Sequence, residues 1–384
     1  MKFMKKIVPW LIGSLMIIAT SAFAEAQNRY ICKTPAPKCV KPQPVPGYNA
    51  PARIDVRGSW NVFLSGSFIL WNLSQDNMSL AFADGLSNAS YIQTNQQING
   101  QYVGMDFNFK PGFKAGLGFN TDQDDWDIYS EYTWLHESNN LSTTGQTLDT
   151  GVVAPLFATW GDAAVLANNA YNNASQTWQC NLDFVDLSLG RAYYVGSYLT
   201  FHPFFGMRGA WIIQDVNVQY INSSFSNASS PLEVPGTLTV IERIHSWGLG
   251  PRIGLDTNWN LGVGIRLFGN ANADLLYTKY TLQNKINFLV SQTVGSHTNG
   301  SQLYTITHED VSALRAHLDL EMGFGWGTYF DNNNWHFDLA AAWGFQAFFD
   351  QNMFTRFFHS PVHKLEPTGN LYAQGLTFTA RFDF

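Results

Sequence analysis

The sequence predicts an all-β protein: a transmembrane, antiparallel, up-and-down β-barrel of about 10 strands, with about 12 or more as the open alternative. Three observations lead to this fold class. The chain begins with an export signal, no long apolar run follows that signal, and ten later segments alternate apolar and polar residues. The connections between these segments are short and long in turn.

The first 24 residues have the three parts of a secretory signal peptide. A basic start, MKFMKK, precedes the apolar stretch IVPWLIGSLMIIAT, and SAFA has the small-x-small pattern of a cleavage site after Ala24. The apolar stretch is too short for a stable membrane anchor, and the cut is not followed by the cysteine of a lipoprotein. We therefore expect an exported chain that is released from its signal.

The composition points to a membrane protein that crosses the bilayer with strands. Hydrophobic residues make up 45% of the chain and only 13% are charged, whereas about a quarter is usual for soluble domains. No run of about 18 apolar residues follows Ala24, which excludes spanning helices. Loss of the three signal lysines changes the net charge from −7 to −10. Such an acidic chain is a poor nucleic-acid binder, because nucleic acids require a basic surface.

Two regions follow the signal peptide. Residues 25–57 are rich in proline with scattered lysines, so they cannot pair as a central strand. We interpret them as an extended N-terminal periplasmic arm. Residues 58–384 form the predicted outer-membrane β-barrel, without a composition break that would mark a second core.

Ten segments of the barrel region alternate with a period of two, which places apolar residues on one face of a strand and polar residues on the other. In the clearest, 313–326, apolar residues from Leu314 to Trp326 alternate with Arg315, His317, Asp319 and Glu321. In a soluble sandwich the apolar face would be core, whereas in an outer-membrane barrel it meets lipid. The segments are 59–72, 105–120, 124–137, 182–194, 199–213, 246–256, 260–277, 313–326, 335–348 and 376–384.

The connections decide between these alternatives. Outer-membrane barrels have short periplasmic turns and long extracellular loops, and a soluble sandwich has no reason to sort its connections in this way. The expected turns lie at 121–125, 195–197, 257–260 and 328–334. The expected loops lie at 73–101, 138–180, 216–238, 283–304 and 350–368.

Two of these loops hold sequence that could be regular structure. The Ala-rich stretch 154–174 is interpreted as a helix in the barrel mouth. The stretches DVNVQYINSSF (215–225) and TLTVIERI (237–244) either extend a hairpin or add a pair of strands.

Several stretches together are similar to a known family. They are GSWNVFLSGSFILWN, FKPGFKAGLGFNTDQDDWDIYSEYTWLH, WGLGPRIGLDTNWNLGVGIRLFGNANADLLY and the aromatic C-terminus. The set resembles the Legionella-type pore-forming major outer membrane proteins, which also occur in Chlamydia-related bacteria. The resemblance covers most of 59–384. It implies an abundant, surface-exposed porin that is sometimes cross-linked through cysteines, in the outer membrane of a Gram-negative bacterium.

The chain has only three cysteines, so a heavily cross-linked coat does not fit. Cys32 and Cys39 lie in the exported arm, where they either close a small disulfide loop or pair with another molecule. Cys180 precedes the fourth strand and is either a bridge between subunits or a thiol at a loop or rim. We expect no metal and no cofactor, because a ligand set with suitable spacing is missing from the sequence.

Charged residues on the polar faces of the strands are candidates for lining a pore, because a lumen keeps charges of both signs hydrated and paired. The candidates are Lys114, Glu131, Arg208, Arg252, Arg266, Arg315, His317, Asp319, Glu321, His336, Asp338 and Arg381. A protease-like site around His308 and Asp310 is an alternative interpretation of the charged residues, with less support than a pore-lining role. We expect no enzymatic activity and no catalytic residues.

The predicted function is a porin that lets small hydrophilic solutes or ions diffuse passively. The alternative is a structural or adhesive surface barrel with a closed lumen, whose loops bind host or neighbouring molecules. Expected partners are outer-membrane lipid, small solutes, the outer-membrane assembly machinery, and a homo-oligomer or disulfide-linked neighbour. The C-terminal Phe384 is interpreted as the assembly signal.

Overall fold

A computed structural model describes residues 49–58, 60–84, 100–145, 156–161, 170–222, 236–290, 302–354 and 369–384. The predicted signal peptide, most of the predicted arm and the pair Cys32 and Cys39 lie outside these residues. The regular secondary structure of the described residues consists of β-strands. These residues include no helix that is long and apolar enough to cross a membrane. The predicted all-β class is confirmed.

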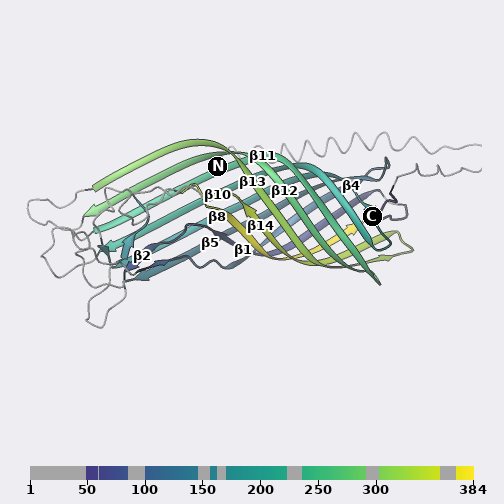
Figure 1. Cartoon of the computed structure of the whole chain (residues 1–384), viewed down its shortest axis with the longest axis horizontal. Helices are drawn as coiled ribbons and strands as arrows, with labels where there is room; N and C mark the ends of the chain where they lie inside the picture. Colours follow the sequence, from purple (N-terminus) through teal and green to yellow (C-terminus); the bar gives the residue numbers. More distant parts are fainter. Residues whose placement is uncertain are drawn as a thin grey trace, which may run out of the picture. The chain divides into compact units, whose positions relative to one another are not determined.

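Ten antiparallel strands form a closed barrel (Figure 1). Each predicted segment corresponds to one of them, so the barrel has ten strands and the alternative of about 12 is wrong. The strands are β1 (Val62–Gln75), β4 (Phe109–Asn120), β5 (Trp126–Thr144), β8 (Asn173–Arg191), β10 (Leu199–Asn222), β11 (Gly236–Gly262), β12 (Ile265–Val290), β13 (Gln302–Phe330), β14 (Trp335–Phe348) and β15 (Leu371–Asp383).

The first and last strands of the ring pair with each other. Strand β15 pairs with β1 from Leu371 opposite Gln75 to Asp383 opposite Phe63. Pairing of β10 with β11 completes the ring. Closure satisfies the backbone N–H and C=O groups of the ring strands, which is the condition for a sheet in hydrocarbon.

The short connections lie at one end of the barrel, which we call the turn end, and the long ones at the other, the loop end. The turns at 121–125 and 195–197 are confirmed, but the other two differ from the prediction. Residues 257–260 are paired within β11, and the turn is the two-residue Val263–Gly264, with φ of 54° and 78°. Positive φ at both positions matches a type I′ hairpin. Likewise, 328–330 belong to β13 and the turn is 331–334.

The strands extend further toward the loop end than predicted. Strand β5 continues to Thr144, and β10 to β13 are 24 to 29 residues long. A tilted strand needs only about 9–11 residues to cross the bilayer, so these strands continue well outside it. The stretches 215–222 and 237–244 pair with each other in β10 and β11. They extend a hairpin and add no strands.

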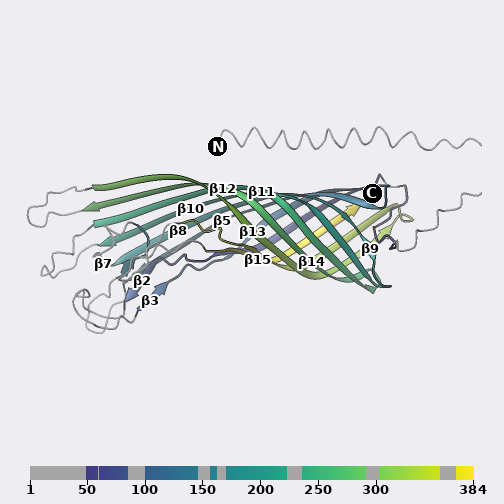
Figure 2. The ribbon, with the colours of Figure 1, turned by 45° about the horizontal axis from the view of Figure 1, so that its top comes forward.

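A second, smaller sheet lies at the loop end (Figure 2). It has the order β3-β2-β6-β7. Its strands are β2 (Ala81–Asp84), β3 (Gly100–Val103), β6 (Leu156–Ala158) and β7 (Ala170–Tyr171). The helix predicted at 154–174 is wrong for its described residues, because β6, β7 and the start of β8 occupy them. A further short strand, β9 (Tyr193–Tyr194), pairs with β10 at the turn end.

The small sheet packs against the inner face of the barrel. The inward-facing Tyr220 of β10 donates a hydrogen bond to the carbonyl of Leu80 (2.5 Å), and it accepts one from the backbone N–H of Thr159 (3.2 Å). The buried Trp160 contacts Phe354, which follows β14. These contacts, with the inward side chains of β8, β10 and β11, form one apolar core. We call it the loop-end core.

Residues 49–58 lie against three turns at the other end. Ala52 donates its N–H to the carbonyl of Ala192, and Arg57 donates its N–H to that of Asn333. Between them, Arg53 forms an ion pair with Asp125 at 3.2 Å. Ala52 thus contacts the β8–β10 connection, and Arg57 contacts the β13–β14 connection. These two connections are not neighbours in the ring. This part of the arm therefore crosses the turn end, and we call it the strap.

Phe384 contacts Trp60 and Trp335 at the turn end, and its N–H donates to the carbonyl of Val62. We expect deletion of Phe384 to lower the yield of assembled barrel severalfold, because these contacts fix the last strand to the first. The heat-modifiable band in isolated outer membranes, compared with total protein, measures this yield. Phe384→Trp keeps an aromatic group and serves as the control. Equal assembled yield after deletion would contradict the assembly role.

Candidate functional site: the charged interior of the barrel

The interior of the barrel between the two ends is polar, while its outer face is apolar. Along β10, the outward-facing Phe205 and Met207 are 54% and 48% exposed, whereas the inward-facing Arg208 is 2% exposed. An apolar exterior with a polar interior is the pattern of a strand that crosses lipid. The charged interior is therefore the candidate functional site.

Two arginines and two aspartates form the centre of this interior. Arg208 donates two hydrogen bonds to the carboxylate of Asp186, at 2.6 and 2.7 Å, and a third to Asp274 at 2.8 Å. Arg252 donates to the same Asp186. His317 Nδ1 lies 2.5 Å from Asp274 Oδ2. We call these five residues the central ion cluster, which joins β8, β10, β11, β12 and β13.

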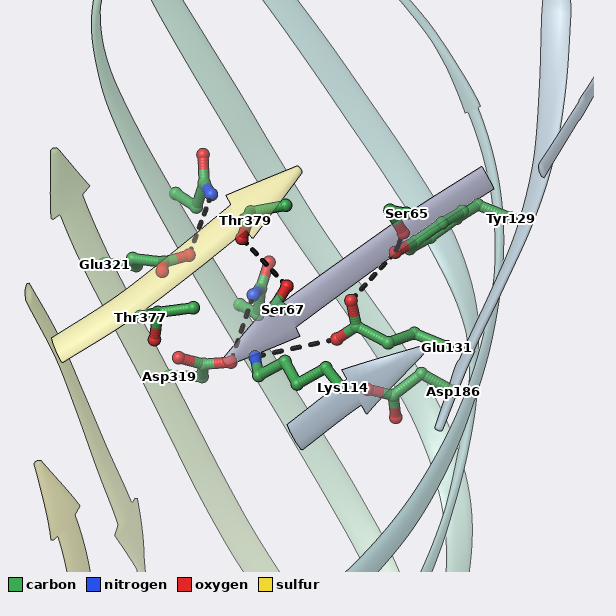
Figure 3. A network of polar contacts seen from close by, with 12 residues as sticks. Ser65, Ser67, Lys114, Tyr129, Glu131, Asp186, Asp319, Glu321, Thr377 and Thr379 are labelled. Carbon is green, nitrogen blue, oxygen red and sulfur yellow. Dashed lines mark hydrogen bonds and ion pairs between the residues drawn. The ribbon is translucent and has the colours of Figure 1, made fainter. Parts of the chain in front are cut away.

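A second group of charges lies beside the cluster, on β4, β5 and β13. Lys114 of β4 forms an ion pair with Glu131 of β5 at 3.6 Å. Figure 3 shows these two side chains pointing into the same interior as Asp319 and Glu321 of β13. The amide of Asn270 donates to Glu321 at 3.2 Å. With the central ion cluster, the group holds three Lys or Arg cations and five carboxylates.

Further charges lie nearer the turn end. His202 bridges Asp127 of β5 and Asp256 of β11, with N to O distances of 2.8 and 3.0 Å. On the opposite wall, Arg266 pairs with Asp338, His336 with Asp383 at 3.1 Å, and Arg381 with Asp383 at 2.6 Å. Two of these contacts skip a strand: His202 of β10 reaches Asp127 of β5, and Arg266 of β12 reaches Asp338 of β14. The others join neighbouring strands or residues of one strand.

All twelve residues predicted as pore-lining candidates face the barrel interior, but the structure separates them into groups. Arg208, Arg252 and His317 belong to the central ion cluster. Lys114, Glu131, Asp319 and Glu321 lie beside it, and Arg266, His336, Asp338 and Arg381 lie toward the turn end. Arg315 is apart from the rest, because it donates to Tyr280 near the loop-end core.

The partners that hold these charges, chiefly Asp186, Asp274 and Asp383, are not among the residues predicted from the sequence. Each of these aspartates lies on the inward face of its strand, so the period of two could have identified it as an interior residue. Asp186 lies in the segment with the weakest alternation, and its link to Arg252 depends on the register of β8, β10 and β11.

The interior is closed in this conformation. Arg208 and His317 are each 2% exposed, and Asp274 is 5% exposed. In a wide, water-filled pore these side chains would be accessible to solvent. The charges instead fill the lumen at this level, as expected for a small barrel in which side chains occupy the interior.

Cys180 and the residues of the protease-like alternative lie elsewhere. Cys180 is a free, fully buried thiol on the inner face of β8, within the loop-end core. Both earlier interpretations, a bridge between subunits and a rim thiol, are wrong for this conformation. His308 and Asp310 face outward on β13, away from the charged interior. Asp310 accepts a hydrogen bond from Thr281 and pairs with Lys279.

This architecture defines the chain as an outer-membrane β-barrel protein. The family model described as the Legionella pneumophila major outer membrane protein precursor matches residues 61–384. The chain therefore belongs to this family, which confirms the resemblance found in the sequence, and it is located in the outer membrane. A comparison with curated proteins finds no match.

Several solved structures are similar over most of their length. A FadL homologue from Pseudomonas aeruginosa has 8% sequence identity, with 84% of this chain and 89% of that chain covered and a TM-score of 0.25. The Pseudomonas putida toluene transporter TodX has 6% identity, coverage of 84% and 88%, and a TM-score of 0.24. OmpT of Vibrio cholerae has 8% identity, coverage of 86% and 100%, and a TM-score of 0.11. At these TM-scores the similarity has no bearing on function.

We expect Arg208→Met to destabilise the barrel by about 3–5 kcal/mol, because Asp186 and Asp274 would lose the main partner of a buried ion cluster. Urea unfolding in phosphatidylcholine vesicles, followed by tryptophan fluorescence, measures the change. Arg243→Met is the control: this arginine faces outward and its side chain is half exposed, so its loss should change stability by only about 0.5 kcal/mol or less. Equal stability of the two variants would show that the cluster does not hold the barrel together.

Proposed function

We propose that the protein is a narrow outer-membrane channel for passive diffusion of small ions and hydrophilic solutes. The observation that carries the proposal is the charged interior across the lipid-facing part of the barrel. Charged rings and constrictions are the means by which pores select ions. Membership of a major outer-membrane protein family supports a porin-like role.

In this proposal, two features have separate roles. The central ion cluster is the constriction, because it is attached to the barrel wall and determines the width of the path. The loop-end core is the gate, since β2, β6 and residues 351–354 belong to connections rather than to the ring. Displacement of these segments determines how often the path opens.

The charges favour cations. Around the central ion cluster, five carboxylates face three Lys or Arg cations, namely Asp186, Asp274, Glu131, Asp319 and Glu321 against Arg208, Arg252 and Lys114. An acidic excess at close range lowers the energy of an entering cation and raises that of an anion. We therefore propose a channel that prefers cations. The proposal includes no enzymatic activity.

A second candidate function is a structural or adhesive surface barrel whose lumen stays closed. Burial of the central ion cluster and the presence of the loop-end core favour it. The two functions differ in one measurable property, the passage of ions through folded protein in a planar bilayer.

We expect the wild-type protein to show small, infrequent current steps with cation preference. The double variant Arg208→Ala, Asp186→Ala removes one charge of each sign from the constriction and should increase the step size severalfold. The step frequency should change little, because the loop-end core is intact. Single-channel recording in potassium chloride measures both quantities.

The control is the double variant Arg243→Ala, Asp215→Ala, which removes an ion pair of the same composition from the outer face, where the two groups lie 3.4 Å apart. Its current steps should equal those of the wild type. Absence of current from both the wild type and the constriction variant, each with a heat-modifiable fold, would refute the channel and support the closed surface barrel.

A further inference from the structure

The outward-facing cations of the long strands gather at one place. In the described strands, the lysines and arginines that face outward on the loop side are Arg243 of β11 and Lys279 and Lys285 of β12. The two strands are neighbours, with Trp247 opposite Lys279 and Arg243 opposite Gln283. His245, which is also exposed, lies between the first two cations. Other described Lys and Arg residues of the ring face the interior or lie at the turn end.

The aromatic residues of β11 give the height of this patch in the membrane. Trp259 and Trp247 face outward, are 55% and 46% exposed, and lie twelve residues apart. This separation is about 41 Å along the strand at about 3.4 Å per residue, or about 29 Å vertically at a tilt of about 45°. It is close to the apolar band of about 25 Å with its aromatic girdles. Trp247 therefore marks the outer boundary of the hydrocarbon.

The cations start at this boundary. Lys279 lies opposite Trp247, and Arg243 precedes Trp247 by four residues, which places Arg243 about 10 Å higher. The headgroup layers add about 5–8 Å on each side of the hydrocarbon, so both long side chains reach them. Lys285 follows Lys279 by six residues and lies about 14 Å above it, beyond that layer.

Below the cations the same two strands present apolar side chains. Leu249, Leu275 and Tyr277 are about half exposed, at 49%, 49% and 53%. The surface is thus apolar below and cationic above, at the depth where a lipid changes from acyl chain to headgroup. Clusters of Lys and Arg next to a membrane attract anionic lipids, and both side chains bind phosphate oxygens.

Two carboxylates adjoin the cations. Asp215 of β10 lies 3.4 Å from Arg243, and Asp310 of β13 lies 3.7 Å from Lys279. The cation side chains remain 50% and 45% exposed, so each keeps donors available to a ligand. With Lys285 included, the patch has three cations and two carboxylates, in contrast to the net charge of −7 of the whole chain.

We propose that Arg243, Lys279 and His245 form a binding site for the phosphorylated headgroup of an outer-leaflet glycolipid of the lipid A class. The acyl chains lie along Leu249, Leu275 and Tyr277, and the headgroup phosphates contact Arg243 and Lys279. Asp215 and Asp310 hold the two cations in place and weaken the site by competing with the phosphate.

The test uses the full mature chain, refolded in a neutral detergent and titrated with diphosphoryl lipid A or with the same lipid after removal of its phosphates. Bound lipid is counted by native mass spectrometry. The wild type should bind the phosphorylated lipid more tightly. The double variant Arg243→Gln, Lys279→Gln should bind it about tenfold more weakly, and its affinity for the dephosphorylated lipid should not change.

Two control variants make the test specific to this site. Lys285→Gln removes the same charge from the same strand, but above the headgroup layer, and should change affinity by less than about twofold. Asp215→Asn combined with Asp310→Asn should strengthen binding, which a purely structural role of these residues does not predict. This gain of affinity also tests the site if the Arg243 and Lys279 variant does not fold.

Several results would overturn the proposal. They are equal binding of the two lipids by the wild type, unchanged affinity in the Arg243 and Lys279 variant, or an equal loss in Lys285→Gln. Full competition by inorganic phosphate at millimolar concentration would identify a site for a free anion instead of a lipid. None of these measurements depends on ion conduction.

Discussion

Each long strand of this barrel crosses the boundary between hydrocarbon and water, and this boundary decides which of its faces is polar. On β10 the lipid-facing Met207 is apolar and the inward Arg208 is charged. Farther along the same strand, the inward Val218 and Tyr220 are apolar and fully buried, while the outward Gln219 is exposed. The period of two continues without a break, but its polarity reverses. Inside the membrane zone the barrel is therefore filled with charges, and outside it with an apolar core.

A charged filling is stable only when the charges are paired, because a ten-stranded lumen has little room for water and an unpaired buried charge is costly. The central ion cluster meets this condition by linking groups from five consecutive strands. Asp186 alone binds Arg208 from the adjacent strand and Arg252 from the next. The pairing holds the wall in one register and also closes the lumen. Stability and conduction therefore make opposite demands on the same side chains.

The sequence was sufficient to locate all ten strands and the inward direction of the twelve candidate residues, since these depend only on a local period of two. It did not locate the strand ends at the loop end. Stretches with Asn, Gln and Lys, such as 216–222 and 283–290, were expected to be loops, because their polar residues occupy the face that is apolar lower down. In these stretches polar residues face outward and apolar residues face inward. An alternation of this reversed kind predicts that the strands continue through them. The partners of Arg208 were not predicted, because they depend on the register between strands: Asp186 lies directly opposite on β8, and Asp274 lies on β12, two strands away.

The reversal of polarity also relates the interior of the barrel to its outer surface. On the outer face of β11, the side chains change from apolar to charged between Trp247 and Arg243. On its inner face, they change from charged to apolar between Arg252 and Ile244. The two sides change at nearly the same height, as they must if one membrane boundary sets both. The outward cations of β11 and β12 thus lie level with the lower part of the loop-end core. A lipid headgroup bound there would contact the strand segments whose inner side chains pack against that core, so lipid on the outside and the gate on the inside share the same stretch of wall.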